Sequence, residues 1–405
     1  MKKISYSEWG IKSPHYWGLL AILGAVVAIG GFAALFMEHS GHWVTGMTNQ
    51  VVWGLPHVFA IFLIVAASGA LNIASIGSVF GKKAYKPLAR LSGLLALTLL
   101  IGGLLVLVLD LGQPGRLIVA MTKYNFKSIF AWNIYLYVGF IAIVVVYLFT
   151  MMERKANDYT HTVGTIAFVW RLLLTTGTGS IFGFIVARQG YDAALMAPMF
   201  IIMSFAYGLA FYLLVLMFTF NADNRAIGDK MIARLKSLLA VFVAAIFYFV
   251  LVYHLTNLYG TENHDYEAFI LLNGGIYTTL FWGGWVVAGL LLPMGILFHP
   301  ALGKSRGAIA AASFLVLIGG FSAIYVVVIG GQAFPMAMFP GKTIIESGFF
   351  DGVGGAAAAY TPSLPEFLLG LGGIGVTLIA TVVAVRLFQF LPASLADEAV
   401  DPHHS

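Results

Sequence analysis

Ten long apolar stretches, separated by short polar segments, dominate the pattern of this sequence. Each stretch runs for about 20 residues without the alternation of a barrel strand, which predicts membrane-spanning helices. Lipid offers no partner for backbone polar groups, so a continuous apolar segment crosses a bilayer as a helix. We expect helices at residues 17–37, 53–80, 88–110, 128–150, 163–187, 193–220, 234–257, 272–298, 307–330 and 365–391.

The order of these stretches predicts an all-α integral membrane protein, with residues 1–405 forming a single polytopic domain. An even number of crossings places both termini on one side of the membrane. The last segment on the opposite side, residues 331–365, is long and rich in Gly and Pro, and we expect it to act as a lid or a docking surface, with a mobile tether as the alternative. The tail at 392–405 is short and polar, and we expect it to be disordered.

Composition and charge agree with a lipid solvent and fix an orientation. The chain has 405 residues, of which 60% are hydrophobic and 10% charged. Sixteen Lys and Arg lie on the side of the termini and five on the other side, with one inside a helix. The positive-inside rule therefore predicts cytoplasmic termini, in a bacterial or archaeal inner membrane. The basic residues lie in short loops and form no basic domain, so nucleic acid is not an expected partner.

The residue types that are missing also restrict the chemistry. The chain contains no Cys, so it holds no iron–sulfur cluster, thiolate zinc or disulfide by itself, and we expect no metal site. All carboxylates fall between helices or at helix ends. Ion pumps and proton-coupled carriers keep acidic groups at mid-membrane, so this distribution disfavours a solute carrier.

Polar and aromatic residues gather at the outer ends of the helices. A His opens the second helix, an Asp ends the third, and further groups follow in the next turn and in helices four, seven and eight. A shallow pocket for an amphipathic ring is one reading of this pattern. There are two alternatives. The Trp residues can belong to an aromatic belt at the membrane surface, and the Asp and Arg can form an ion pair that fixes the turn. The candidate pocket residues are His57, Asp110, Arg116, Ser128, Trp132, Asn133, His254 and Tyr277, with His57 and Asp110 as the proton-transferring groups.

A second polar set lies deeper in the membrane. Ser68, Asn72 and Ser75 share the helical face of His57, and Arg171 shares a face with Thr175 on the fifth helix. A path for protons is one interpretation of these residues. For the second helix, the other interpretation is close helix packing through small residues. For Arg171, it is snorkelling together with interhelical hydrogen bonding. His57 and His254 are the only intramembrane His on one side, so a single haem b is a further alternative.

Three sequence segments carry a resemblance to a known family. They are LDLGQPGRL at 109–117, NFKSIFAWN at 125–133, and GLP at the start of the second helix together with ASGALNIASIGSVFG. The chain resembles the NrfD/PsrC family, the membrane subunits of polysulfide-reductase-type complexes. It is most similar to the DsrP type, which belongs to the DsrMKJOP complex of sulfur metabolism. Family members read Ser-x-x-Ser-Trp-Gly at the fourth helix, where this chain keeps Ser128 and Trp132 but has Ala131 and Asn133.

The resemblance implies two four-helix bundles plus two extra helices, and a subunit that exchanges electrons between membrane quinones and a periplasmic module. It implies an exchangeable menaquinone or ubiquinone and no redox group held by this chain. The implied partners are a periplasmic ferredoxin-like iron–sulfur subunit (DsrO-like), a multihaem cytochrome c (DsrJ-like), a haem b membrane subunit (DsrM-like) and a cytoplasmic iron–sulfur subunit (DsrK-like). A structural anchor without quinone chemistry and a haem b-bearing cytochrome remain the alternative functions.

Overall fold

Ten helices long and apolar enough to cross a membrane make up the computed structural model, which describes residues 5–10, 14–336 and 359–400. This confirms the expected all-α membrane fold for the described part of the chain. The spans are formed by α1 (Pro14–Ser40), α2 with α3 (Leu55–Ala70, Asn72–Ser78), α4 (Ala89–Leu109), α6 (Ile129–Met152), α7 (Thr160–Gly183), α8 (Met196–Ala222), α9 (Asp229–Tyr259), α11 with η7 and α12 (Ile276–Thr279, Leu280–Leu291, Leu292–Phe298), α13 with η9 and α14 (Arg306–Tyr325, Val326–Gly330, Gly331–Ala333), and α15 (Leu364–Leu387).

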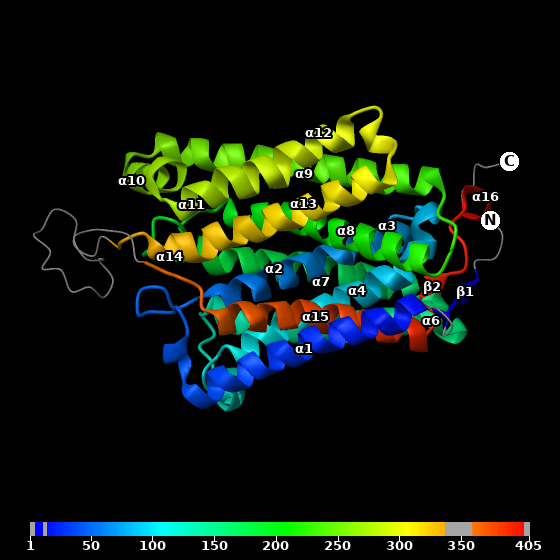
Figure 1. Ribbon diagram of the computed structural model, residues 1–405, viewed down its shortest axis with the longest axis horizontal. Coiled ribbons are helices and arrows are strands. Elements are labelled where there is room, and N and C mark those ends of the chain that lie inside the picture. Colours follow the sequence, from blue (N-terminus) through cyan, green and yellow to red (C-terminus); the bar gives the residue numbers. More distant parts are fainter. Residues whose placement is uncertain (1–4, 11–13, 337–358, 401–405) are drawn as a thin grey trace, which may run out of the picture.

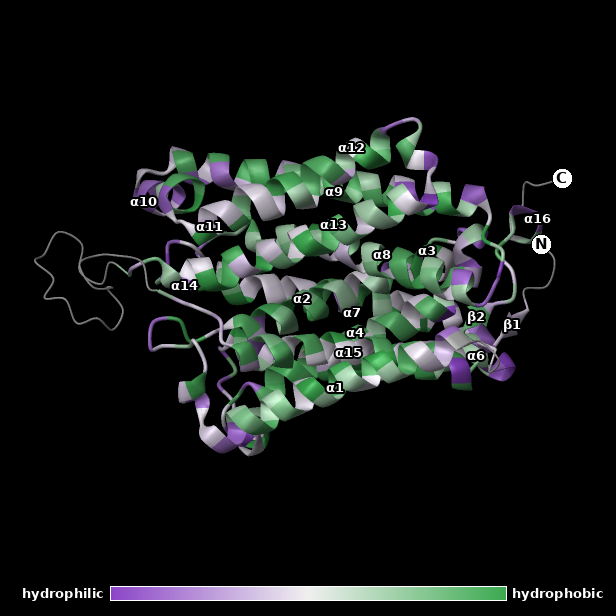
Figure 2. Ribbon diagram, in the orientation of Figure 1, coloured by the Kyte–Doolittle hydropathy of each residue, from purple (hydrophilic) through white to green (hydrophobic). Residues whose placement is uncertain are grey.

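The helices form two groups of four, with a pair of helices beside the first group. One group contains α2, α4, α6 and α7, and the other contains α8, α9, α13 and the π-helical η7. The pair α1 and α15 packs together, and α15 also packs on α4 and α2. Figure 1 shows the helices side by side, with both termini at the same end. We call that end the inner end and the opposite end the outer end. Apolar residues form a broad band between two polar ends (Figure 2).

The two groups meet where α2 crosses α8, and two glycines allow this crossing. A Cβ atom on Gly69 would lie 1.6 Å from the carbonyl oxygen of Ser204, and one on Gly208 would lie 2.1 Å from the backbone nitrogen of Ala70. Both distances are far shorter than van der Waals contact. Small residues at such positions let membrane helices approach closely. Because α2 is held in the centre, its outer end has a fixed place in the first group.

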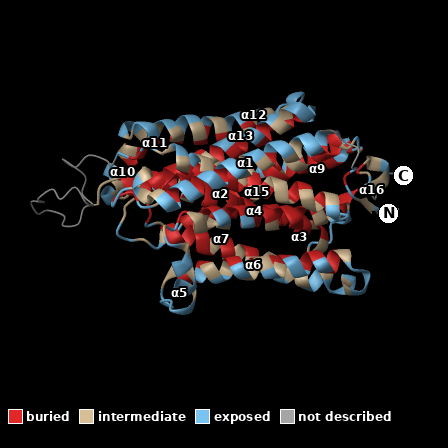
Figure 3. Cartoon of the chain, turned by 60° about the horizontal axis from the view of Figure 1, so that its bottom comes forward, coloured by how far each residue is buried: buried red, intermediate tan, exposed pale blue. Residues whose placement is uncertain are grey.

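Short elements cover the outer end. They are η1 (His42–Val44), η3 (Pro114–Arg116), α5 (Leu117–Thr122), η5 (Thr261–Asn263), α10 (His264–Ala268) and η6 (Phe269–Asn273). Figure 3 shows α5 standing away from the helix ends beside α6. The expected loop at 331–365 begins later than predicted, because Gly331–Ala333 continues the ninth span as α14. Residues 337–358 of that loop lie outside the described part of the structure.

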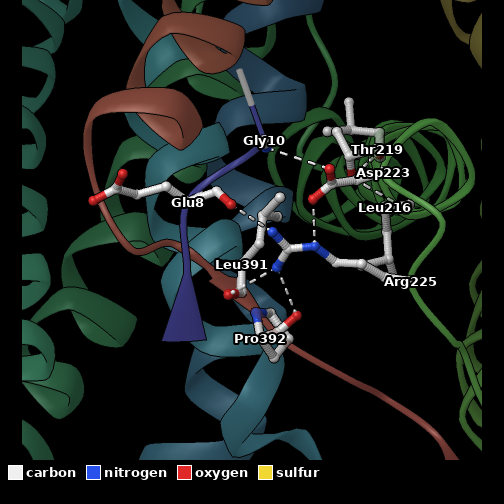
Figure 4. A network of polar contacts seen from close by, with 9 residues as sticks. Glu8, Gly10, Leu216, Thr219, Asp223, Arg225, Leu391 and Pro392 are labelled. Atoms are coloured by element: carbon white, nitrogen blue, oxygen red, sulfur yellow. Dashed lines mark hydrogen bonds and ion pairs between the residues drawn. The ribbon is translucent and has the colours of Figure 1, made fainter. Parts of the chain in front are cut away.

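The described part of the C-terminal tail is folded, so the expectation of a disordered tail was wrong for it. Strand β2 (Leu391–Pro392) pairs antiparallel with β1 (Tyr6–Ser7), and α16 (Asp397–Val400) follows. Arg225 joins these segments, as Figure 4 shows. Its Nε donates to Asp223 Oδ2 at 2.6 Å, and its two terminal nitrogens donate to the carbonyls of Glu8 and Pro392 at 2.7 and 3.0 Å. The guanidinium therefore compensates for the few backbone hydrogen bonds of a two-residue strand. The remaining short helices of the inner side are η2 (Lys83–Leu88), η4 (Arg154–Tyr159) and η8 (Leu302–Lys304).

Candidate functional site

A cavity of about 340 Å³ lies within the first helix group, in its outer half. Residues of α2 at helical spacing form one side, with Trp53 just before the helix and His57, Ile61 and Ile64 on it. Clefts of roughly 300–1,000 Å³ with apolar walls and a few polar groups are typical of small-molecule sites. The other lining residues are Leu104, Leu107, Val108 and Leu111 next to or on α4, Leu117 and Met121 on α5, Phe130, Asn133, Ile134, Tyr137 and Val138 on α6, and Ile181 and Phe182 on α7.

His57 and Asp110 form the charged centre of this site. The Nδ1 atom of His57 lies 2.7 Å from Oδ2 of Asp110, whose side chain is fully buried. The two atoms are at ion-pair distance without the alignment of a linear hydrogen bond, and neither Asp110 oxygen accepts a hydrogen bond from another described residue. A carboxylate buried in this way requires a compensating positive charge or proton. Asp110 is not among the cavity-lining residues, so it acts on the cavity through His57.

The cavity opens between α4 and α6 toward the outside of the helix group. Leu111, Phe130 and Val138 line the cavity and are also exposed on the surface. In an integral membrane protein this apolar surface faces lipid. Helix α5 lies beside the outer end of the cavity and contributes Leu117 and Met121 to its lining, whereas Ile118 is exposed. A ligand carried in the lipid phase could therefore reach His57 without crossing water.

Aromatic rings surround the imidazole. The ring of Trp53 stacks on His57 with a centroid distance of 6.3 Å and an interplanar angle of 23°. Phe130 and Phe182 contact the Trp53 ring at 5.6 and 6.0 Å. Tyr137 lines the cavity from α6, one turn below Asn133. Such flat, apolar walls suit a planar ring whose polar atoms lie at its edge.

A series of polar side chains, which we call the polar track, leads from the cavity into the helix group. Asn133 Nδ2 donates to the carbonyl of Gly177 at 3.0 Å, and Tyr137 and Thr178 hydroxyls are 3.4 Å apart. Farther in, Ser68 and Thr175 share a hydrogen bond of 2.5 Å. Arg171 then donates to Asn72 Oδ1 at 3.1 Å. The polar track consists of Asn133, Tyr137, Thr178, Thr175, Ser68, Arg171 and Asn72.

Arg171 is fully buried, with Phe168 and Phe205 at 5.0 and 4.6 Å from its guanidinium carbon. Of the two alternatives to a proton path, interhelical hydrogen bonding is present, whereas a side chain that snorkels to the surface is not observed. The Ser75 hydroxyl donates to the carbonyl of Leu71, one turn earlier in the same span, which is a bond within the helix and not between helices. Toward the inner end, the Ser78 and Tyr147 hydroxyls contact each other.

His254 lies in the second helix group and does not line the cavity of His57. Its Nδ1 is 2.6 Å from Oε2 of the fully buried Glu267, and Asn257 donates to the other oxygen at 2.8 Å. The His254 ring also packs against Phe281 at 4.7 Å. Tyr277 lies in the same group, against Phe269 and Tyr325. The structure therefore separates these two candidates from His57, Asp110 and Asn133, which it brings together.

The other three candidates lie at the outer surface near the cavity. Arg116 is exposed in η3, and Asp110 contacts His57 instead of this Arg, so the ion pair considered for the turn is absent. Ser128 precedes α6, and Trp132 is exposed, with its Nε1 donating to the carbonyl of Phe126. No group of three or more His, Cys, Asp or Glu that could hold a metal occurs among the described residues.

Several residues of the site escaped the sequence analysis. Trp53 and Tyr137 each lie four residues from a candidate, so helical spacing could have found them. Glu267 has no such signal, because it comes from the segment after α9 and reaches His254 only through the fold.

Comparisons with known proteins agree with this architecture. The family described as polysulphide reductase, NrfD, matches residues 43–336. The Hdr-like menaquinol oxidoreductase integral membrane subunit of Archaeoglobus fulgidus is 30% identical over 391 residues, covering 96% of this chain and 97% of that protein. A selenate reductase subunit of Mesobacillus selenatarsenatis is 22% identical over 89% of this chain and 91% of its own. Protein NrfD of Escherichia coli is 23% identical over 70% of this chain and 96% of its own. The chain is therefore an integral membrane protein that belongs to the polysulphide reductase NrfD family.

Proposed function

We propose that this chain is the quinone-reactive membrane subunit of a multi-subunit oxidoreductase complex. The observation that carries the proposal is a histidine backed by a buried carboxylate, at the wall of an apolar cavity that opens between α4 and α6. A lipid-soluble ring with polar edges matches that opening and those walls. The menaquinol oxidoreductase subunit of Archaeoglobus fulgidus supports the same ligand class, since this chain aligns with it over nearly its whole length.

His57 is the residue that exchanges protons with the ring. Oxidation of a quinol releases two protons and two electrons, and the electrons leave for a redox group on a partner subunit. With Nδ1 directed at Asp110, the other ring nitrogen of His57 is free to accept a quinol hydroxyl proton. Asp110 then stabilises the imidazolium that forms. In the reverse direction the same groups deliver protons to a quinone.

The polar track provides a route for protons between the cavity and the interior of the first helix group. Asn133 and Tyr137 line the cavity, and Thr178 connects to both of them. Thr175, Ser68, Arg171 and Asn72 continue toward the inner end. Within the track, Thr178 and Thr175 share no direct side-chain hydrogen bond, and Ser68 and Arg171 are joined through each other's backbone carbonyls. We assign Arg171 the role of holding Ser68 and Asn72 in place beside α7, through its hydrogen bonds to the Ser68 carbonyl and the Asn72 side chain.

The proposal includes a location and a set of partners. The basic residues at the inner end support termini in the cytoplasm of a bacterial or archaeal cell, and the cavity would then lie in the outer leaflet of the inner membrane. An electron-carrying partner would then dock at the outer end, as a periplasmic iron–sulfur or cytochrome c subunit. The DsrP-like segments support a complex of dissimilatory sulfur metabolism with DsrO-, DsrJ-, DsrM- and DsrK-like subunits. Because the Archaeoglobus relative is a menaquinol oxidoreductase subunit, we propose menaquinone as the quinone.

The test compares the wild-type complex with a His57→Gln variant in a naphthoquinol oxidation assay. A general base typically contributes about 10²- to 10⁴-fold, so kcat should fall by at least about 100-fold while the complex still assembles. Unchanged turnover would make the chain a structural anchor. A Soret band in the purified chain alone would instead identify it as a haem b cytochrome.

A further inference from the structure

Gln332 forms a bridge between the two helix groups at the outer end. It lies in α14, is 1% exposed, and reaches the segment that precedes α2. Its Oε1 accepts hydrogen bonds from the backbone N–H groups of Val52 and Trp53, both at 3.0 Å. Its Nε2 donates to the carbonyl of Trp53 at 3.0 Å and to the carbonyl of Val328 at 2.7 Å. Both oxygen lone pairs and both N–H groups of this amide are therefore directed at backbone.

The bridged segment has no regular structure of its own. Val52 and Trp53 lie in neither a helix nor a strand, so their N–H groups depend on a side chain for a partner. Buried or half-buried backbone N–H groups require such partners. Gln332 therefore takes the place of a neighbouring strand for the two residues immediately before α2. Without it, the N–H groups of Val52 and Trp53 would lose the partner that fixes the backbone at these two residues.

Arg188 and Tyr191 hold the other side of the bridge. The Arg188 guanidinium donates to the carbonyl of Gln332 at 2.8 Å and to the carbonyl of Gln50 at 3.2 Å. Tyr191 donates to the carbonyl of Val328 at 2.6 Å, and its ring stacks on Trp53 at 6.4 Å. Two distant parts of the chain, residues 188–191 and 328–332, thus converge on the segment of Trp53, whose ring forms a cavity wall and stacks on His57.

We propose that Gln332 is a positioning residue of the quinone cavity, through which the second helix group fixes the Trp53 wall in the first. The inference rests on the proposed function and adds to it a determinant of ring binding that does not line the cavity. Because Gln332 contacts neither His57 nor Asp110, it affects where the ring lies and leaves proton transfer unchanged. A change at Gln332 should therefore weaken binding of the quinol more than it slows turnover.

The experiment uses the intact complex with Gln332→Leu, which keeps the side-chain size and removes all four hydrogen bonds. Hydrogen exchange of the peptide containing Val52 and Trp53 should become at least 10-fold faster. The KM for a soluble naphthoquinol should rise about 10-fold, with kcat within twofold of wild type. Thr278→Val is the matched control, because the Thr278 hydroxyl also bonds backbone at the outer end, to Gly274 and Phe269, away from Trp53. It should leave exchange at 52–53 and the KM unchanged.

The outcomes separate the inference from the proposed function. Faster exchange without a change in KM would show that Gln332 has a structural role only and would overturn the inference. If Gln332→Leu does not assemble, Gln332→Glu replaces the donor with a carboxylate oxygen that opposes the carbonyls of Trp53 and Val328, so exchange at 52–53 should become faster and KM should rise about threefold. A KM unchanged in that variant would also overturn the inference. A normal kcat in His57→Gln would refute the quinone site itself, and the inference with it.

Discussion

Replacing Asp110 with Asn tests the centre of the proposed mechanism with little change in shape. Asn has nearly the same size as Asp, so the packing between α2 and α4 is preserved. What disappears is the negative charge 2.7 Å from His57 Nδ1. The quinol must transfer a proton to His57, and the resulting imidazolium loses its counter-charge in this variant. We expect slower turnover with nearly normal ring binding, because Asp110 does not line the cavity.

The size of the effect follows from the distance. The charges of an imidazolium and a carboxylate are spread over each group, so their centres are about 4 Å apart, and two unit charges at that separation attract each other by roughly 4 kcal/mol at an effective dielectric constant of about 20. The amide dipole of Asn and local rearrangement recover part of this, which leaves about 2–3 kcal/mol. At about 1.4 kcal/mol for each factor of ten, kcat should fall by roughly 30- to 150-fold.

The assay is single-turnover oxidation of a naphthoquinol by the assembled complex, followed by the absorbance of the quinone formed. Asp192→Asn serves as the control, since Asp192 is an exposed carboxylate at the same end of the molecule. If Asp110→Asn keeps kcat within twofold of wild type, the carboxylate does not stabilise the imidazolium and the mechanism is refuted. An equal loss in Asp192→Asn would show that only the general charge of the outer end matters.

Three further predictions concern stability. Gly208→Val should destabilise the protein by about 3 kcal/mol or more, measured by the midpoint of thermal unfolding, because the new Cβ would overlap the backbone of α2. Gly31→Ala is the control, since its Cβ would meet open space, and it should not lower that midpoint. Glu267→Gln should cost roughly 1.5–3 kcal/mol in the same measurement, since it removes the charge that strengthens the hydrogen bonds with His254 and Asn257. Arg225→Ala removes hydrogen bonds of a charged group worth roughly 1.5–3 kcal/mol each, so limited proteolysis should cut residues 391–400 at least 10-fold faster.

The sequence predicted the helices well because lipid imposes one simple requirement on every span. Ends of helices were harder to predict, since they depend on contacts that hydropathy does not register. The ninth span extends through Gly331–Ala333 because Gln332 finds backbone partners before α2. The C-terminal tail was predicted to be disordered from its polarity, yet Arg225 and β1 provide partners from distant parts of the chain.

The candidate site was predictable in part, for a related reason. Helical spacing and topology placed His57, Asp110 and Asn133 at one end of neighbouring helices, and the structure brings them together. Topology alone could not show that His254 belongs to a different helix group, because depth in the membrane says nothing about lateral position. The carboxylate partner of His254 was equally hidden, since Glu267 lies in a short segment between spans. Lateral position follows from which helices pack together, and that depends on small residues such as Gly69 and Gly208.

The two histidine–carboxylate pairs differ in whether the imidazole borders a cavity, and this difference decides their chemistry. In each pair the Nδ1 atom lies within 2.7 Å of a fully buried carboxylate, so charge alone does not distinguish them. Glu267 also accepts a hydrogen bond from Asn257, whereas Asp110 accepts none from the described residues, which leaves its charge to His57. His57 borders a cavity with an opening between α4 and α6, and the ring of His254 is packed against Phe281. Proton exchange with a lipid-borne ring requires contact between the ring and the imidazole, and of these two pairs the His57 pair has a cavity in which that contact can form.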